Sequence, residues 1–261
     1  MDYKQEQVDV RGCQVPLLTG GQGPALLLLH GPGGAGRWLE FHDRLAEHFT
    51  VCAPVHPGFG GTPLPGWVRA AEDLALHYVD LIRILGLKRP LVAGLSLGGW
   101  IATELAVFRS DLLAGLVLID ALGVRPERPI PDLFIMDPME SIAFLFADPA
   151  KATAMMPQEM GVDAIVRMWE EQAAIARLAW TRPYNPQLRR RLHHITVPTL
   201  IAWGGADRLI PPDHGRMLAR EIEGARFELI EASGHMAAVE QPGPLAEAIT
   251  RFARTIGLTA A

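Results

Sequence analysis

The stretch Leu91–Trp100, LVAGLSLGGW, predicts how this chain folds around one serine. An apolar run ends in the pattern G-x-S-x-G, filled by Gly94, Ser96 and Gly98, and a helical pattern follows at once. This order predicts a buried strand, a tight turn and a helix. The turn strains the backbone of the serine, and the positions two residues away must lack side chains for it to close. We therefore expect the Ser96 hydroxyl to be a nucleophile at the edge of a sheet, rather than an incidental loop serine.

Short apolar runs alternate with helical patterns on both sides of this motif. Most of the runs are apolar throughout, as are strands that are buried on both faces of a parallel sheet. The alternation predicts an α/β fold with a mostly parallel sheet and helices on both faces. The predicted strands are residues 24–31, 49–55, 89–95, 113–121, 198–204 and 225–231.

One long segment interrupts the alternation. Between Asp120 and Val197 the chain has no convincing strand, and proline-separated helical patterns cover 137–148, 162–180 and 186–195. A helical insertion between two strands of a parallel sheet is expected to cover their carboxyl ends, where α/β proteins bind ligands. We therefore predict a core domain of residues 1–121 and 197–261, and a helical cap (lid) of residues 122–196.

The composition disfavours several classes of protein. A chain of 261 residues, 49% of them hydrophobic, can bury a large core, and its net charge of −5 disfavours nucleic acid or an anionic membrane as partner. No apolar run approaches the ~18 residues of a membrane span. The polar N-terminus does not resemble a signal peptide, and Cys13 and Cys52 are expected to be buried thiols in a reducing compartment. We expect a cytoplasmic protein, and no sequence feature decides between a monomer and a homodimer.

A serine hydroxyl needs a base to accept its proton and an acid to orient that base. Among nine histidines, His235 is the preferred base because it lies late in the chain, in a small-residue loop after the last predicted strand. His30 is instead expected to make structural hydrogen bonds through its ring. Asp207 is the preferred acid because its loop follows a buried strand and directly precedes the final strand. Asp120, which also ends a strand, is the alternative acid.

Acyl transfer also needs N–H donors for the oxyanion that forms on the substrate. The N–H of Leu97 is the first candidate, because it lies at the start of the helix after Ser96. The second is expected in the turn GPGG that follows an early strand. Pro32 has no N–H to donate, so Gly33 or Gly34 must supply it, and we favour Gly33. The same glycines fit a phosphate-binding loop poorly, because no lysine follows at the required spacing.

Five segments stand in a fixed order along the chain: HGPGG, HPGFGGTP, GLSLGG, GGADRLIPP and SGHMAAVEQP. With the order serine, acid, histidine, they resemble the α/β-hydrolase family over nearly the whole length. The resemblance implies a mostly parallel eight-stranded sheet, a helical cap and an acyl-enzyme mechanism without a cofactor or a metal. It also implies that Ser96 is the nucleophile, Asp207 the acid, His235 the base and Leu97 an oxyanion donor.

Two subgroups of that family look most similar. The segment WGGADRLIPPDHGRML, and Arg167 beside MWEEQ, resemble hydrolases that cleave carbon–carbon bonds in ring-fission products of aromatic compounds. That subgroup usually has Asn before the nucleophile and Trp after the histidine, where this chain has Leu95 and Met236. The segment GLSLGG is more similar to simple carboxylesterases and enol-lactone hydrolases. Serine in place of aspartate at position 96 disfavours dehalogenase and epoxide hydrolase chemistry.

Methionines and aromatic residues in the predicted cap suit an adaptable apolar pocket, although packing between cap and sheet explains the same spacing. The apolar candidates are Met136, Met139, Phe144, Phe146, Met155, Met156, Trp169 and Trp180. Arg167 and Arg125 are candidates for binding a carboxylate. We select Met136, Phe144, Arg167 and Trp169 as substrate-binding residues. We expect a serine hydrolase of small to medium apolar carboxylic esters. The alternatives are a carbon–carbon bond or enol-lactone hydrolase and a non-catalytic ligand receptor.

Overall fold

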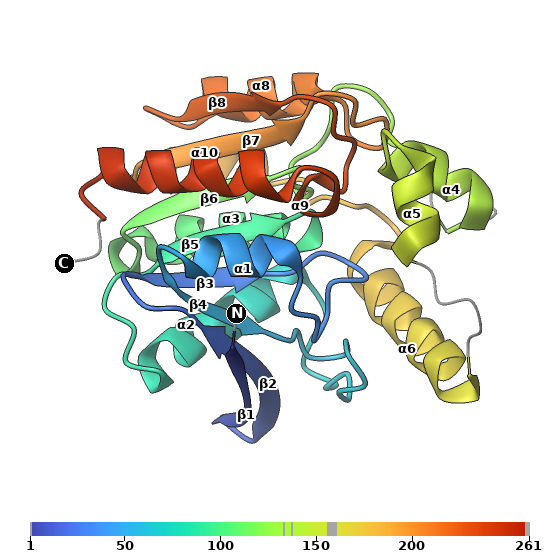
Figure 1. The fold of residues 1–261 in the computed structure, drawn as a ribbon, viewed down its shortest axis with the longest axis horizontal. Coiled ribbons are helices and arrows are strands. Elements are labelled where there is room, and N and C mark those ends of the chain that lie inside the picture. Colours follow the sequence, from blue (N-terminus) through green and yellow to red (C-terminus); the bar gives the residue numbers. More distant parts are fainter. Residues whose placement is uncertain (1, 133, 137, 156–160, 259–261) are drawn as a thin grey trace.

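The computed structural model describes residues 2–258 except 133, 137 and 156–160 (Figure 1). The described residues form one eight-stranded sheet in the order β1-β2-β4-β3-β5-β6-β7-β8. Strand β2 is antiparallel to both of its neighbours, and the other pairs are parallel. This topology confirms the predicted sheet. The strands are β1 (Tyr3–Val10), β2 (Cys13–Gly20), β3 (Ala25–Leu29), β4 (Thr50–Pro54), β5 (Leu91–Leu95), β6 (Gly115–Ile119), β7 (Thr199–Gly204) and β8 (Arg226–Ile230).

The hairpin of β1 and β2 is the part of the sheet that apolar runs do not predict. Strand β1 lies at the sheet edge and is exposed over most of its length, so it needs no apolar face. Its turn has Arg11 and Gly12 at φ 54° and 85°, a backbone suited to a tight hairpin. Cys13 in this hairpin is half-buried, which corrects the expectation that it is buried, whereas Cys52 in β4 is buried.

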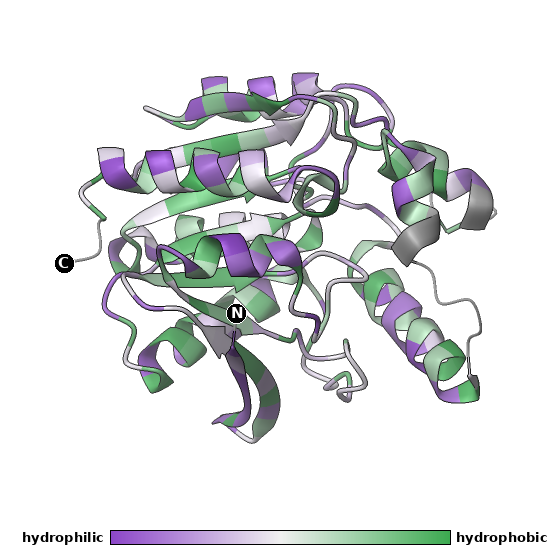
Figure 2. Ribbon diagram, in the orientation of Figure 1, coloured by the Kyte–Doolittle hydropathy of each residue, from purple (hydrophilic) through white to green (hydrophobic). Residues whose placement is uncertain are grey.

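Helices cover both faces of the sheet and give each face its own apolar core. On one face pack α1 (Glu40–Ala46), α9 (Ala237–Glu240) and α10 (Pro242–Thr255); on the other pack α2 (Ala71–Ile84), α3 (Leu97–Arg109) and α8 (Pro212–Glu221). Along β5, Val92 belongs to one core, and Leu91 and Ala93 belong to the other. Figure 2 shows the central strands as mainly hydrophobic, as expected for strands buried on both faces.

The segment between β6 and β7, residues 122–196, is called the insertion below. Its helices are α4 (Pro138–Leu145), α5 (Pro149–Met155), α6 (Val162–Ala179) and α7 (Leu188–Arg191). Helices α4, α5 and α6 lie beyond the carboxyl ends of the central strands (Figure 1). The described part of the insertion contains one β-bridge, between Gly123 and Tyr184, which joins its two ends. Helices α4, α6 and α7 lie within the predicted helical patterns, whereas α5 was not predicted. The division into a core and a cap domain stays a prediction.

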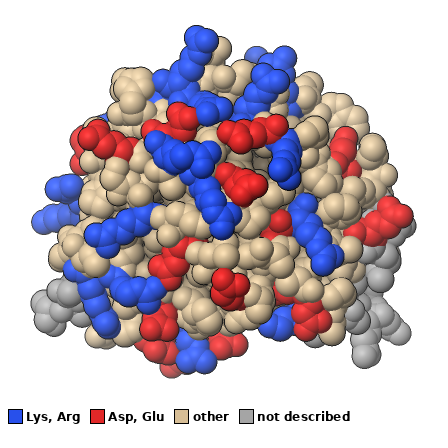
Figure 3. All heavy atoms as spheres, turned by 90° about the horizontal axis from the view of Figure 1, so that it is seen from above, with Lys and Arg blue, Asp and Glu red and all other residues tan. Residues whose placement is uncertain are grey.

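The surface carries both signs of charge. Figure 3 shows basic and acidic side chains interspersed on the face seen from above. Ion pairs such as Arg189–Glu221 and Arg251–Glu228 join charged residues from different elements. Within the part of the chain that the structure describes, no helix combines the length and the apolar composition that a membrane crossing needs.

Candidate active site

Ser96 lies in the tight turn between β5 and α3. Its backbone has φ 49° and ψ −111°, a sparsely populated conformation that costs about 1–3 kcal/mol in a non-glycine residue. Both flanking glycines are required by close backbone contacts. A Cβ on Gly94 would lie 2.3 Å from the carbonyl oxygen of Gly98, and a Cβ on Gly98 would lie 2.2 Å from that of Leu29. The turn therefore has the strained geometry that the G-x-S-x-G pattern predicts.

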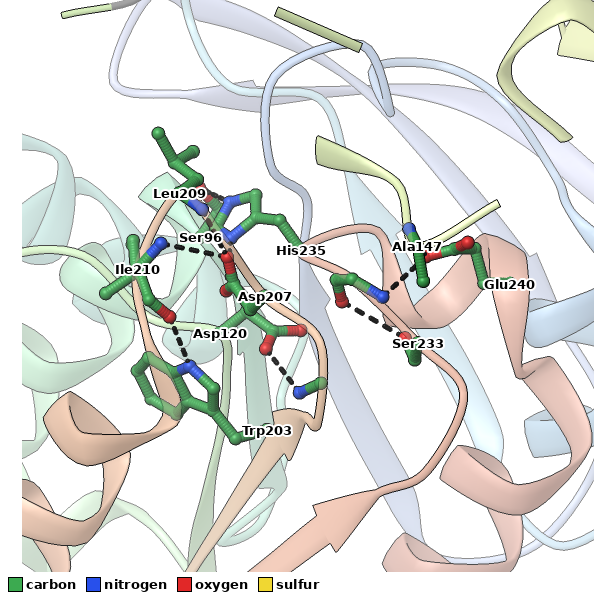
Figure 4. Close-up of polar contacts among 12 residues, drawn as sticks. Ser96, Asp120, Ala147, Trp203, Asp207, Leu209, Ile210, Ser233, His235 and Glu240 are labelled. Atoms are coloured by element: carbon green, nitrogen blue, oxygen red, sulfur yellow. Dashed lines mark hydrogen bonds and ion pairs between the residues drawn. The ribbon is translucent and has the colours of Figure 1, made fainter. Parts of the chain in front are cut away.

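Three side chains from distant parts of the chain form one hydrogen-bonded series (Figure 4). His235 lies in the loop between β8 and α9, and Asp207 follows β7. The distance from His235 Nε2 to Ser96 Oγ is 2.9 Å, and that from His235 Nδ1 to Asp207 Oδ2 is 2.9 Å. The side chains of His235 and Asp207 are 3% and 0% exposed, so little water competes for these bonds. With Nδ1–H donating to the carboxylate, Nε2 is left to accept the proton of Ser96.

Backbone N–H groups orient the carboxylate of Asp207. Its Oδ1 accepts hydrogen bonds from Leu209 N–H at 2.9 Å and Ile210 N–H at 2.8 Å, which leaves Oδ2 for the histidine. The alternative acid, Asp120, accepts a hydrogen bond from Gly204 N–H at 2.7 Å and makes no bond to His235. Burial and the nearby Asp207 raise the pKa of Asp120 well above its usual range, which favours its neutral form.

The glycine-rich turn after β3 lies beside Ser96. A Cβ on Gly31 would be 3.2 Å from the Cβ of Ser96. Gly34 N–H donates to the carbonyl oxygen of Gly31 at 3.2 Å, with Gly33 at φ 76° inside that turn. This bond occupies the N–H of Gly34, whereas the N–H groups of Gly33 and Leu97 make no hydrogen bond to any described residue. The N–H of Leu97, directly after Ser96, and that of Gly33, in the turn that follows Gly31, are therefore not engaged by the described residues.

A buried pair of histidines holds this turn, as expected for His30. His30 Nδ1–H donates to Gly31 O at 2.9 Å, and His30 Nε2 accepts from His56 N–H at 3.0 Å. His56 Nε2–H donates to His30 O at 2.8 Å, and its Nδ1 accepts from the hydroxyl of Tyr78. Burial lowers the pKa of His30 to about 4, so both ring nitrogens act through a neutral imidazole.

The predicted cap residues differ in how far they are buried. Phe144 is half-buried and packs against the main core, and Met136 is also half-buried. Arg167 is exposed and lies over Gly61, while Trp169 is 67% exposed. Met156 and the side chains of Met139 and Met155 lie outside the described residues. Substrate contacts by these cap residues stay predictions.

Sequence reasoning missed two buried carboxyl groups that connect the insertion to the site. Glu240 accepts a hydrogen bond from Gly234 N–H, next to His235, and Glu104 lies in the helix that starts after Ser96. They are 2% and 0% exposed. The one available signal was an acidic residue in an apolar segment, AAVE for Glu240 and TELA for Glu104.

The arrangement brings together a hydroxyl, an imidazole and unengaged N–H groups. An imidazole hydrogen-bonded to a serine hydroxyl, beside a helix N-terminus, is suited to nucleophilic attack by that hydroxyl on a carbonyl group. Among the described residues, no group of three or more His, Cys, Asp or Glu side chains is placed to hold a metal ion.

Comparison with known proteins agrees with this arrangement. Residues 26–248 match the model of the alpha/beta hydrolase family. The chain is similar to the 2-hydroxy-6-oxo-6-(2'-aminophenyl)hexa-2,4-dienoic acid hydrolase of Metapseudomonas resinovorans, with 27% identity over 96% of this chain and 91% of that protein.

Two solved structures are similar over nearly the whole chain. A thermophilic esterase from Thermogutta terrifontis has 25% identity and a TM-score of 0.70, and the match covers 98% of this chain and 99% of that one. A membrane phospholipase A has 25% identity and a TM-score of 0.77, over 98% of this chain and 87% of that one.

Proposed function

The chain belongs to the α/β-hydrolase family, and we propose that it is a cofactor-independent serine hydrolase that cleaves small to medium apolar carboxylic esters. One observation carries the proposal: His235 lies within hydrogen-bond distance of both Ser96 Oγ and Asp207 Oδ2. A buried serine, histidine and aspartate in this relation form a catalytic triad.

In the proposed mechanism, Ser96 Oγ attacks the ester carbonyl while its proton passes to His235 Nε2. The oxyanion of the tetrahedral intermediate accepts hydrogen bonds from the N–H groups of Leu97 and Gly33. His235 then gives its proton to the leaving alcohol, and an acyl group remains on Ser96. Water, deprotonated by His235, hydrolyses this acyl-enzyme. Asp207 holds the imidazole and stabilises its protonated form throughout.

Apolar neighbours of the triad support an apolar ester over a charged dienoate. Leu95 precedes the nucleophile. Met236 follows the base and packs against a small apolar cluster of the insertion, formed by Ile142, Phe146 and Ala152. The similar thermophilic esterase is consistent with this substrate class. Two cysteines without a disulfide support a reducing compartment, so we propose a cytoplasmic location.

Hydrolysis of carbon–carbon bonds is the second candidate. It is favoured by the similarity to the dienoic acid hydrolase of Metapseudomonas resinovorans over most of both chains. A yellow ring-fission dienoate distinguishes the two activities, because its bleaching at a rate well above ester turnover would favour carbon–carbon cleavage. A receptor role predicts tight ligand binding with no turnover across a broad panel of esters.

The decisive experiment measures hydrolysis of p-nitrophenyl acetate and butyrate by the parent and by Ser96→Ala. We expect Ser96→Ala to lower kcat by about 10⁴-fold or more, because no nucleophile remains. Ser110→Ala is the matched control, since Ser110 is as buried as Ser96 but lies at the opposite end of α3. Retained turnover in Ser96→Ala would exclude the proposed nucleophile.

A further inference from the structure

The carboxylate of Glu240 joins two segments that are far apart in the sequence. Its Oε2 accepts hydrogen bonds from Gly234 N–H at 2.6 Å and Ala147 N–H at 3.2 Å, and its Oε1 accepts from Asp148 N–H at 2.9 Å. Gly234 directly precedes His235, and the other two donors link α4 to α5. Figure 4 shows Glu240 at this junction, on the far side of the His235 loop from Asp207.

The backbones of the two segments are in direct contact at the same place. A Cβ on Gly234 would lie 2.7 Å from Ala147 N and 2.8 Å from Leu145 O, so only glycine fits there. On the other side of His235, Met236 N–H donates to Leu145 O at 3.1 Å. Both neighbours of the histidine are thus bonded to the insertion, Gly234 through Glu240 and Met236 directly.

Apolar packing and a cation reinforce this junction. Ile142, Phe146 and Ala152 form a small core of their own, and Met236 and Val239 from the His235 loop and α9 pack against it. Lys151 Nζ also donates to the main-chain oxygen of Glu240 at 2.5 Å. Helices α4 and α5 therefore share a small core with the segment that carries His235, in addition to the contacts of Phe144 and Leu145 with the main core.

We propose that Glu240 is a positioning residue that couples the insertion to His235, through a carboxylate that accepts N–H groups from both segments. This inference rests on the proposed role of His235 as the base. Movement of α4 and α5, as when a substrate enters beneath them, shifts Gly234 and Met236 and with them the imidazole. Loss of the carboxylate releases the coupling, so the base loses its alignment with Ser96 Oγ while the sheet stays folded.

The test uses Glu240→Gln, which keeps the size of the side chain but turns one acceptor oxygen into a donor that faces N–H groups. The first readout is the rate at which a fluorophosphonate labels Ser96. Ser96 Oγ attacks phosphorus, fluoride leaves and His235 takes the proton, so labelling reports the alignment of the base without depending on ester preference. We expect labelling and kcat to fall about 10- to 100-fold, with KM within about threefold of the parent value.

The second readout is amide hydrogen exchange in the peptides that cover 141–152 and 231–240. In Glu240→Gln we expect faster exchange in both peptides together, because one carboxylate protects donors in each. Glu247→Gln is the matched control, since its side chain on α10 is 79% exposed. A merely structural role would leave labelling per folded molecule unchanged. Lys151→Met, which removes the contact with the main-chain oxygen of Glu240 but leaves its carboxylate in place, should give a smaller effect of the same kind.

The outcomes separate this inference from the proposed function. Parent-like labelling by Glu240→Gln, or faster exchange confined to 231–240, would overturn the coupling. If the parent is labelled but hydrolyses no ester, the substrate class is wrong and the labelling rates still test Glu240. If the parent is not labelled, the amide hydrogen exchange of the two peptides tests the coupling: faster exchange in both supports it, and parent-like exchange overturns it. If Glu240→Gln does not fold, Lys151→Met gives the same two readouts, and unchanged values in both would refute the proposal.

Discussion

The turn around Ser96 and the insertion beyond it are held in place by different kinds of contact. At the turn, backbone packs against backbone so closely that Gly94 and Gly98 admit no side chain. The insertion has a similarly close backbone contact at Gly234, but it also depends on side chains, among them three carboxyl groups. Glu171 accepts a hydrogen bond from Gly60 N–H at 2.9 Å, and Glu104 accepts one from Asn185 Nδ2–H at 2.8 Å. Glu240 accepts hydrogen bonds from the N–H groups of Ala147 and Asp148.

This difference predicts how each region responds to change. Close backbone packing has few alternative arrangements, so it fixes the nucleophile in one geometry. Single side-chain hydrogen bonds contribute modestly and can be lost one at a time, so we expect the loss of one to loosen the insertion by degrees while the sheet stays folded. Substitutions at the triad should therefore have all-or-none effects on catalysis, whereas substitutions at the insertion should have graded ones.

Among substitutions that leave the Ser96 hydroxyl in place, the largest effect is expected from Asp207→Asn. An amide in place of the carboxylate no longer selects the tautomer in which His235 Nε2 accepts the serine proton, so kcat should fall about 10⁴-fold. The measurement is kcat for p-nitrophenyl butyrate per labelled serine. Thermal unfolding of the variant should stay cooperative.

Asp120→Asn is the matched control for that substitution. The pKa of Asp120 is raised by burial and by Asp207, so asparagine resembles the neutral form that the protein already favours. Its Oδ1 can still accept Gly204 N–H. We expect kcat within about threefold of the parent value. Equal losses of kcat in the two variants would mean that catalysis depends on both carboxyl groups. The all-or-none effect could then not be assigned to the hydrogen bond between Asp207 and His235.

The positions of Ser96, Asp207 and His235 could be predicted from the sequence, because their geometry is local or is set by the order of the strands. The spacing of Gly94, Ser96 and Gly98 specifies a turn, and Asp207 and His235 follow consecutive strands that end at one edge of the sheet. The polar strand β1 gave no such signal, because an edge strand that is mostly exposed needs no apolar face.

The contacts of the insertion were harder to predict, because helical periodicity does not show which apolar face of a helix is buried. In α6, Val162, Val166 and Trp169 share one face and are all exposed, whereas Ala174 and Leu178 on another side are buried. Trp169 was therefore selected on a pattern that fits either face. Glu240 escaped notice for another reason, since its partners Ala147 and Asp148 lie 93 and 92 residues away along the chain.

The free energy of unfolding is expected to depend on pH through Glu104, which contacts the insertion where the chain returns to the sheet. Asn185 Nδ2 donates to both Glu72 and Glu104, and burial is the largest cause that raises the pKa of Glu104 from 4.5 to about 7. Between these values the folded state binds more protons than the unfolded state, so the free energy of unfolding falls as pH rises from about 4.5 to about 7. The fall attributable to Glu104 is at most roughly 3 kcal/mol.

Glu104→Gln should remove that fall. Glutamine resembles the protonated acid and keeps an oxygen that accepts from Asn185 and Trp100. In urea titrations at about pH 5 and about pH 8, the difference in free energy of unfolding should shrink by up to roughly 3 kcal/mol relative to the parent. Glu223→Gln, at an exposed position, should leave the difference unchanged. An undiminished difference in Glu104→Gln would assign the pH dependence to other groups.

The smallest effect is expected at α6. Glu171 makes one exposed hydrogen bond to Gly60 N–H, and Ala174 beside it packs against Gly58. Glu171→Ala should lower the free energy of unfolding by about 1 kcal/mol or less, and Glu171→Gln by less still, because its amide oxygen can accept the same N–H. For p-nitrophenyl acetate, kcat should not change in either variant. A loss of kcat above about tenfold would show that α6 fixes the geometry of the site as the turn does, and the contrast between the two regions would not hold.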